Sequence, residues 1–361
     1  IPDNDELFAQ TVDGAYVVTS FAMTGRETTE AAPAIKAGFA ENGDRAAPYL
    51  PAYAGAMKVL SNIESKVAGN GALNAIPESD GVYRRIPMFM TLNDQIYPSL
   101  VAESLRVAQD ASTFIIQAVG ASGEEGFGET GLVSFKVGAV KVPTDENGQI
   151  WVRFTGDIPE RYVPAWKLLD GSAPAEKLEG HIVLIGTSAA AMKDLRATPL
   201  DPAAAGVSLH AEALETILTG NFLNRPDFAH GLEVVASFLL GLLFIWLLPK
   251  WGSIWCAVLT FAAIVGVVGG AWYAFDVYNW LLDPIYFSVV ILVIYLTQSL
   301  IIFLATEAER ARVRGAFGMY LSPALVEQLA SDPEQLKLGG EMKDISIMSV
   351  SYTHLTLPTN R

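Results

Sequence analysis

Residues 232–305 read LEVVASFLLGLLFIWLL (232–248), GSIWCAVLTFAAIVGVVGGAWYAF (252–275) and PIYFSVVILVIYLTQSLIIFLA (284–305), three apolar runs with short breaks between them. A helix needs about 20 apolar residues to cross the ~30 Å hydrocarbon core of a bilayer. Each run reaches or approaches that length, and the second and third contain no charged residue, which would be costly to bury in lipid. We therefore expect three transmembrane helices over these ranges, with the lipid bilayer as a partner.

The charged residues beside these runs predict the side of the membrane on which each end lies. Lys250 separates the first two runs, and three arginines follow the third run within residues 306–314. The break after the second run contains Asp276 and Asp283 and no basic residue. Because lysine and arginine near span ends are retained in the cytoplasm, we expect residues 1–230 outside it and residues 306–348 inside it, in a multi-pass protein.

The composition indicates a polar acidic part and a separate apolar part. The 361 residues carry a net charge of −15, yet the mean hydropathy is positive. About 230 residues precede the apolar runs, which is enough for one large or two small domains with a proper core. The acidic balance argues against nucleic acid as a partner, because phosphate binding needs a basic face. The single cysteine, Cys256, lies in the second run, so we expect an outer domain without disulfides.

Strand-like and helix-like segments alternate before residue 230, which predicts an α/β domain with a mixed sheet. The apolar and β-branched segments predict strands over 15–21, 57–63, 113–119 and, fully buried, 181–185. Amphipathic or capped segments predict helices over 4–12, 98–110, 163–169, 174–178 and 208–219. Residues 25–52 are expected to form a long loop. Turn residues predict one hairpin at Asn93–Asp94 and a second that pairs 132–142 with 149–154 across PTDENG.

Two stretches of the outer domain carry a family resemblance. They are DGVYRRIPMFMTLNDQIYPSLVAESLR (80–106) and HIVLIGTSAAAMKDLRATPLDPAAAGVSLHAEALETILTGNFLNRP (181–226), followed by the three apolar runs. In this order they resemble the cyclase/histidine kinase-associated sensory extracellular (CHASE) domain of the second type. The resemblance implies an extracytoplasmic sensor over 1–230 for a ligand that the sequence does not identify. It also implies another span before the sensor, so we expect the natural N-terminus to lie upstream of Ile1.

A third stretch, RARVRGAFGMYLSPALVEQLASDPEQLKLGGEMKDISIM (310–348), resembles the linker that enters a class III adenylate/guanylate cyclase domain. In that family the first catalytic strand follows the LGGE turn and delivers a metal-binding aspartate. Here the strand would open at residues 345–348, and no aspartate follows. We therefore expect 306–348 to be a short helical cytoplasmic linker with the start of a cyclase domain, and 349–361 to be a non-native tail.

The cyclase resemblance has further implications. It implies a bacterial inner-membrane protein that forms a homodimer, because class III catalysis takes residues from two chains. It also implies Mg²⁺ or Mn²⁺ in a catalytic domain that lies beyond this sequence, while residues 1–361 contain no assigned catalytic residue and no cofactor site. Three alternatives stay open: a sensor for a histidine or Ser/Thr protein kinase, a non-enzymatic membrane-anchored binding module, and a transporter subunit. The linker favours the cyclase, and the charge-free runs disfavour transport.

Several polar residues of the outer domain are candidates for sensing a ligand. Thr187 and Ser188 follow the expected strand 181–185, at the end where α/β sheets usually bind ligands. In the same loop, Asp194 and Arg196 contact either a ligand or each other, and mutual pairing is the simpler interpretation. His210 on the helix 208–219 lines a cleft or is structural. The candidate ligand-sensing residues are therefore Arg84, Thr187, Ser188, Asp194, Arg196 and His210.

Other motifs in the sequence give no site. Arg84 and Arg85 are adjacent on an expected strand, so at most one of them points into a pocket. Residues 126–131 fit GxGxxG, but a strand-like segment follows and three glutamates lie nearby, which favours a loop over a dinucleotide site. No histidine pairs with another ligand at metal-binding spacing. Gly266 and Gly270 form GxxxG in the second run, which permits close helix packing.

Overall fold

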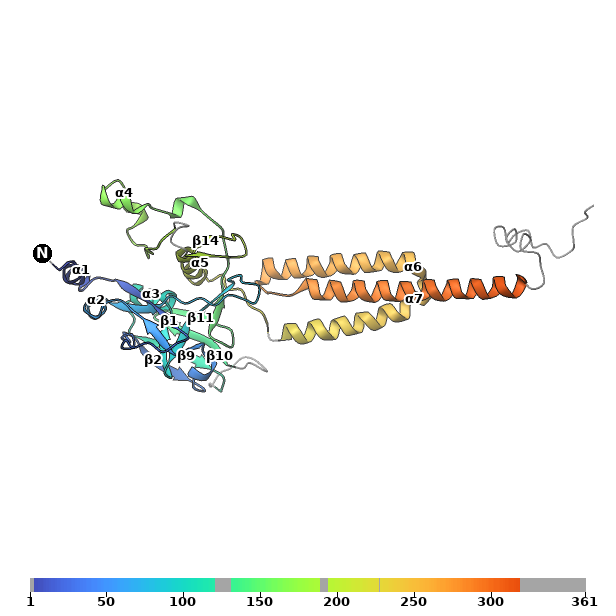
Figure 1. Cartoon of the computed structure of the whole chain (residues 1–361), viewed down its shortest axis with the longest axis horizontal. Helices are drawn as coiled ribbons and strands as arrows, with labels where there is room; N and C mark the ends of the chain where they lie inside the picture. The colour runs from blue at the N-terminus through green and yellow to red at the C-terminus, as the bar shows by residue number, and fades with distance from the viewer. Residues whose placement is uncertain (1–2, 121–130, 189–193, 227, 319–361) are drawn as a thin grey trace, which may run out of the picture. The chain divides into compact units, whose positions relative to one another are not determined.

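The computed structural model describes residues 3–120, 131–188, 194–226 and 228–318 (Figure 1). The chain divides into two compact units, Ile1–Leu239 with Ala262–Val289, and Leu240–Phe261 with Val290–Arg361. The first unit contains an α/β domain together with the adjoining parts of two long helices. The second unit contains the remaining parts of those helices.

Three sheets form the framework of the α/β domain. The first has the order β4-β1-β5, with β4 (Gly55–Met57) antiparallel and β5 (Gly69–Ala72) parallel to β1 (Val18–Thr24). The second has the order β11-β10-β9-β2; its strands are β2 (Gly38–Asn42), β9 (Thr113–Ala118), β10 (Leu132–Val137) and β11 (Val140–Pro143). β2 pairs with β9 in parallel and the other pairs are antiparallel, so both sheets are mixed, as predicted.

The third sheet has the order β3-β7-β8, and two smaller ladders accompany it. Its strands are β3 (Ala52–Tyr53), β7 (Phe89–Leu92) and β8 (Gln95–Pro98). β7 and β8 form the predicted hairpin, and Asn93 and Asp94 both have positive φ, as a tight hairpin turn requires. The ladders pair β6 (Arg85–Pro87) with β12 (Gln149–Trp151) and β13 (Leu195–Arg196) with β14 (Ala204–Ala205).

Two helices supply most of the helical part of the core. The domain's helices are α1 (Asn4–Val12), α2 (Ser61–Lys66), α3 (Leu100–Ala108), α4 (Ala165–Leu169) and α5 (Gly206–Thr219). Short 3-10 turns cover Ala47–Tyr49, Pro159–Arg161 and Ala175–Lys177. α3 packs on β1 and β5 and also contacts α5. α5 ends at Gly220, whose positive φ (69°) closes the helix in the left-handed conformation that glycine favours.

The main core is aromatic at its centre. Phe89 on β7 makes edge-to-face contacts with Phe114 on β9 and Phe135 on β10, with ring centroids 5.2 and 5.0 Å apart. On β9, Phe114 and Ile116 are buried while Ile115 between them is exposed, which is the period-2 pattern of a strand with one face on the core. This core joins the sheets to α3 and α5.

Four predictions about the outer domain are wrong in detail. Residues 181–185 form no strand: Ile182 and Leu184 pack on the core, but Ile185 is 95% exposed, so apolar composition alone was misleading. The hairpin across PTDENG does not form, because β10 turns back through Gly138 to β11, and β12 pairs with β6 instead. Residues 57–63 leave β4 after Met57 and enter α2. The expected loop 25–52 contains β2 and part of β3.

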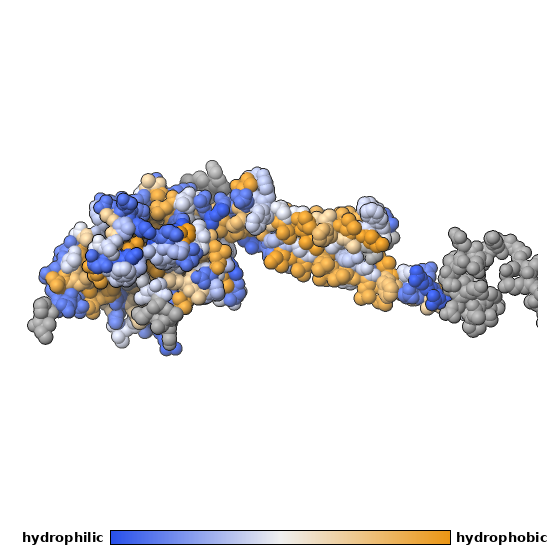
Figure 2. Space-filling model, turned by 90° about the horizontal axis from the view of Figure 1, so that it is seen from above, coloured by the Kyte–Doolittle hydropathy of each residue, from blue (hydrophilic) through white to orange (hydrophobic). Residues whose placement is uncertain are grey.

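The helices beyond residue 228 are long and apolar. α6 (Phe228–Tyr278) is interrupted at Gly252, whose φ of 75° and ψ of 164° are not helical, and α7 covers Pro284–Gly318. Two segments are long and apolar enough to cross a membrane, Ile254–Tyr278 and Pro284–Gly315, whereas the first apolar helix, Gly231–Leu247, is shorter. The second and third expected spans are thus present as candidate membrane helices, and the three-span expectation is not confirmed. Figure 2 shows apolar residues covering the surface of these helices.

Candidate functional site

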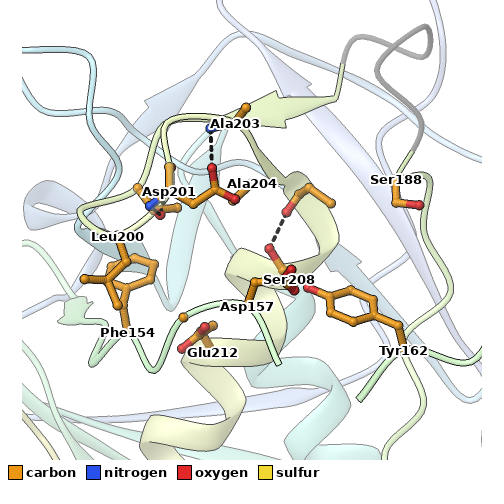
Figure 3. A pocket seen from close by; sticks show the side chains of 13 residues that line it. Phe154, Asp157, Tyr162, Ser188, Leu200, Asp201, Ala203, Ala204, Ser208 and Glu212 are labelled. Carbon is orange, nitrogen blue, oxygen red and sulfur yellow. Dashed lines mark hydrogen bonds between the residues drawn. The ribbon is translucent and has the colours of Figure 1, made fainter. Parts of the chain in front are cut away.

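A cavity of about 290 Å³ opens beside α5 in the α/β domain (Figure 3). α5 contributes Ser208 and Glu212, which are four residues apart and therefore lie on the same face of the helix. The segment after β12 contributes Phe154, Asp157 and Tyr162, and the loop 198–205 closes another side. The cavity thus lies between one rigid helix and two connecting segments, an arrangement common in ligand sites.

Local hydrogen bonds fix the loop 198–205. The Asp201 carboxylate accepts a hydrogen bond from the Ala203 backbone N–H at 2.8 Å, and the Asp201 N–H donates to Thr198 Oγ1 at 3.0 Å. The Ser208 hydroxyl donates to the Ala205 carbonyl at 2.6 Å (Figure 3). These bonds are typical of turns built by short polar side chains, and they hold the loop against the first turn of α5.

Glu212 is the most unusual residue of the cavity. It is only 8% exposed, and its Oε2 accepts hydrogen bonds from the Thr155 N–H (2.7 Å) and the Thr155 hydroxyl (3.1 Å). Within the described ranges, no Lys, Arg or His nitrogen lies within 4.0 Å of this carboxylate. The neighbouring Arg161 instead pairs with Glu215 at 2.7 Å. A buried carboxylate with only neutral donors is costly to the fold.

The rest of the lining adds negative charge and one phenol. Asp157 and Asp201 also line the cavity, and none of the lining residues that the structure describes is basic. The pKa of Tyr162 is raised, first by burial and then by the negative charge of Asp157, to which the phenol also hydrogen-bonds. The site therefore has a negative potential and disfavours anionic ligands.

The structure brings one of the sequence-predicted residues into this cavity. Ser188 lines it, and Thr187 beside it is solvent-exposed. Arg84 makes a two-pronged ion pair with Asp80 (3.0 and 2.7 Å) at the surface, which lowers the pKa of Asp80 to about 2. Arg84 does not line the cavity.

The other three candidates form a separate cluster. Asp194 and Arg196 pair at 3.2 Å, as the simpler interpretation of the sequence holds, and the Arg196 guanidinium lies 5.5 Å from the centre of the Tyr83 ring. Near them His210 is 8% exposed, and its Nδ1 has no hydrogen-bond partner in the described part of the chain. Burial lowers the pKa of His210 to about 4, and the charge of Asp194 only partly opposes this. The ligand-sensing role assigned to these residues stays a prediction.

The sequence analysis missed the residues that build the cavity, namely Phe154, Asp157, Tyr162 and Glu212. One signal was available on α5, because Ser208 and Glu212 share a face at a four-residue spacing. His210 is two residues from each and points to another side of the helix, so it does not line this cavity. The segment 154–162 has no sequence period and gave no signal.

A second set of contacts joins the α/β domain to the ends of the apolar helices within the first compact unit. The Arg153 guanidinium donates to the Asn279 side-chain oxygen in the connection between α6 and α7, and it lies 5.5 Å from the centre of the Phe275 ring. Asn224, after α5, accepts from the Leu281 N–H at 2.8 Å and donates to the Asn279 carbonyl at 2.9 Å. These contacts form a continuous hydrogen-bonded junction.

The beginning of α6 is bound to the same connection. Glu233 Oε1 accepts from the Asp283 backbone N–H at 3.0 Å, and Glu233 Oε2 pairs with Arg225 at 3.2 Å. Glu233 is the second residue of the apolar run 232–248. Its two partners satisfy both carboxylate oxygens at this end of the helices.

The fold is an α/β domain with a cavity, joined by hydrogen bonds to helices long and apolar enough to cross a membrane, which is the arrangement of a sensor domain on a membrane protein. Residues 2–265 match the model of the CHASE2 domain, and the chain belongs to this family. The match covers the α/β domain, the shorter apolar helix and the first part of the next one. No curated protein and no solved structure gives a match. The part of the predicted resemblance that concerns the sensor is therefore confirmed.

Proposed function

We propose that this chain receives a signal outside the cytoplasm and relays it across the bacterial inner membrane to a class III adenylate or guanylate cyclase domain. The junction of Arg153, Asn224 and Asn279 carries this proposal, because it gives the sensor a direct connection to the helices that would cross the membrane. The family assignment, the basic residues after α7 and the cyclase-like linker at 310–348 support it.

The cavity and the junction are linked through three consecutive residues. Glu212 in the cavity accepts from Thr155, and Phe154 lines the same cavity. Arg153 then donates its backbone N–H to Thr216 Oγ1 on α5 at 3.1 Å and its side chain to Asn279. A ligand that moves Glu212 or Phe154 thus acts on a segment bonded to the α6–α7 connection. Such a relay is a two-state change biased by binding.

On the cytoplasmic side the output would come from two copies of the chain. Residue 307 lies within α7, which extends to Gly318. A change in the relative placement of the two copies of residues 307–320 would bring the cyclase domains together or apart. Mg²⁺ or Mn²⁺ would belong to that domain, and no residue of this sequence is assigned to hold it. The rival outputs are a histidine or Ser/Thr protein kinase, or binding alone.

The gene sequence after codon 348 tests the output most cheaply. Phe-Ser-Asp followed by a second acidic metal ligand would support a cyclase, and the protein should then form cyclic AMP or cyclic GMP in membranes with Mg²⁺ or Mn²⁺. A phosphoacceptor-histidine domain or a protein-kinase domain at this place would refute the cyclase. In the cyclase case, Arg153→Ala should change cyclic nucleotide formation without changing protein abundance, whereas Arg45→Ala at the exposed pair with Asp94 should not.

A further inference from the structure

The cavity beside α5 has a charge that its own residues do not balance. Three carboxylates line it, on Asp157, Asp201 and Glu212, and the described lining residues include no basic side chain. Glu212 is buried, and its Oε1 makes no hydrogen bond to any residue in the ranges that the structure describes. One turn further along α5, Glu215 is more exposed and yet fully paired with Arg161. Arg161 also donates to Thr155 Oγ1 at 3.1 Å, but in the part of the chain that the structure describes it forms its ion pair with Glu215 and not with Glu212.

We infer that this cavity binds a small organic cation, an aliphatic amine or a guanidine, with its charged group at Glu212. This rests on the proposed sensing function for its biological meaning. An ammonium group supplies the positive charge and the N–H donors that Glu212 Oε1 lacks, and a charge-assisted hydrogen bond in a buried site is among the strongest polar contacts in proteins. Phe154 and Tyr162 offer aromatic faces for the cation and for its carbon chain.

The shape and chemistry of the cavity exclude other ligand classes. Its volume of about 290 Å³ is at the lower end of small-molecule sites, which fits a ligand of a few heavy atoms. An anion would face three carboxylates. A metal ion is disfavoured, because no group of three or more His, Cys, Asp or Glu side chains in the described part of the chain is close enough to hold one.

A second, smaller cavity shows that acidic lining alone is not unusual in this domain. It has a volume of about 220 Å³, and its lining includes Glu41, Arg45 and Asp94. There the Arg45 guanidinium pairs with Asp94 at 3.3 Å, and Glu41 accepts from the Ala46 N–H at 2.6 Å. The charges of this cavity are mixed and partly compensated, so it gives no comparable reason to bind a cation.

Isothermal titration calorimetry on the full chain in lipid nanodiscs tests the inference. The probes are butylamine, putrescine and guanidine as cations, with butanol as the neutral and butyrate as the anionic analogue. We expect at least one cation to bind at least tenfold more tightly than butanol, and butyrate not to bind. Glu212→Gln should weaken cation binding about tenfold or more, because it removes the charge from the hydrogen bond. The control Asp94→Asn, in the second cavity, should bind as wild type does within about twofold, because its pair with Arg45 is exposed.

A second variant covers the case in which Glu212→Gln fails to fold. Asp157 is exposed, so Asp157→Asn is expected to leave the fold intact and to weaken cation binding about threefold or more by removing one of the charges. Cations that bind no better than butanol, or folded variants at both sites that bind them as wild type does, would overturn the inference.

The binding measurement is separate from the proposed output. If the chain binds amines but cyclic nucleotide formation never responds to them, the cation site is supported and the relay is refuted. A chain that binds no amine but whose cyclase answers another stimulus refutes the cation site and leaves the relay standing.

Discussion

The side chain of Arg153 donates a hydrogen bond to Asn279, which lies 126 positions further along the chain in the connection between α6 and α7. The backbone N–H of Arg153 donates to Thr216 on α5. One residue therefore touches the helix that lines the cavity and the connection between two candidate membrane helices. Because its neighbours Phe154 and Thr155 contact the cavity or Glu212, Arg153 links the cavity directly to those helices.

Replacing Arg153 by alanine should loosen this route without unfolding the domain. The variant loses a hydrogen bond from a charged group and the contact with Phe275, which together are worth about 1.5–3 kcal/mol. We expect amide hydrogen exchange in residues 279–283 to rise about tenfold or more, measured by mass spectrometry on the chain in nanodiscs. Arg45→Ala, which breaks an exposed surface pair with Asp94, is the matched control and should leave these amides unchanged. Equal protection in wild type and Arg153→Ala would show that the contact carries no coupling.

A buried ion pair on α3 should be important for stability. Glu103 accepts two hydrogen bonds from Arg106 at 2.9 and 2.7 Å, and its side chain is fully buried. Arg106→Met leaves that carboxylate buried without its partner and should cost about 3–5 kcal/mol of unfolding free energy. This loss of unfolding free energy is measured by urea denaturation, with amide hydrogen exchange in β9 and β10 as the readout.

The surface pair of Arg84 and Asp80 provides the control for that experiment. Arg84→Met should cost less than about 1 kcal/mol, because exposed pairs are screened by water. Losses of similar size in the two variants would contradict the buried role of the Glu103–Arg106 pair.

His210 should make the sensor less stable in acid. Its folded-state pKa of about 4 lies below the ordinary value of 6.5, so the unfolded chain binds a proton more readily than the folded one. This contribution leaves stability unaffected above pH 6.5, and stability then falls as the pH drops from 6.5 to 4, by about 3 kcal/mol in total. In a series of thermal melts between pH 6.5 and 4, the unfolding midpoint of His210→Gln should change less with pH than that of the wild type. An unchanged pH slope in the variant would assign the acid sensitivity to other groups.

The expected orientation can be tested by chemical labelling. Ser112 is exposed in the α/β domain, and Glu309 is exposed near the end of α7. In a Cys256→Ala background, a membrane-impermeant maleimide added to spheroplasts should label Ser112→Cys and should label Glu309→Cys only after lysis. The reverse pattern would place the sensor in the cytoplasm and would contradict the proposed direction of signalling.

Local signals in the sequence predicted the elements whose structure depends on local physics. The apolar and β-branched residues of 113–119 predicted β9, Asn93–Asp94 predicted a hairpin turn, and the helix expected over 208–219 ends at Thr219 as α5 does. Each follows from the side chains or the backbone conformation of neighbouring residues. The apolar helices after residue 231 were visible for the same reason.

Long-range pairing decided the features that the sequence did not predict. β12 lies beside β6, 60 or more positions away, because the Asp145 carboxylate accepts from the Asn147 and Gln149 N–H groups and sends the chain away from β10. Residues 181–185 have strand composition, but no partner strand reaches them, and Ile185 lies in solvent. The acidic cavity brings Asp157 and Glu212 together from segments about 55 positions apart. No local sequence pattern predicts that these two residues lie close together.

Disulfide crosslinking between two copies of the chain tests the relay most directly. Single cysteines at successive positions of residues 307–314, in the Cys256→Ala background, report which faces of the two helices meet in the membrane. We predict that Arg153→Ala, but not Arg45→Ala at the exposed pair with Asp94, changes the pattern of crosslinking yields along these positions, because Arg153→Ala releases the α6–α7 connection from the sensor. An identical pattern in wild type and Arg153→Ala would contradict a relay from the sensor through these helices.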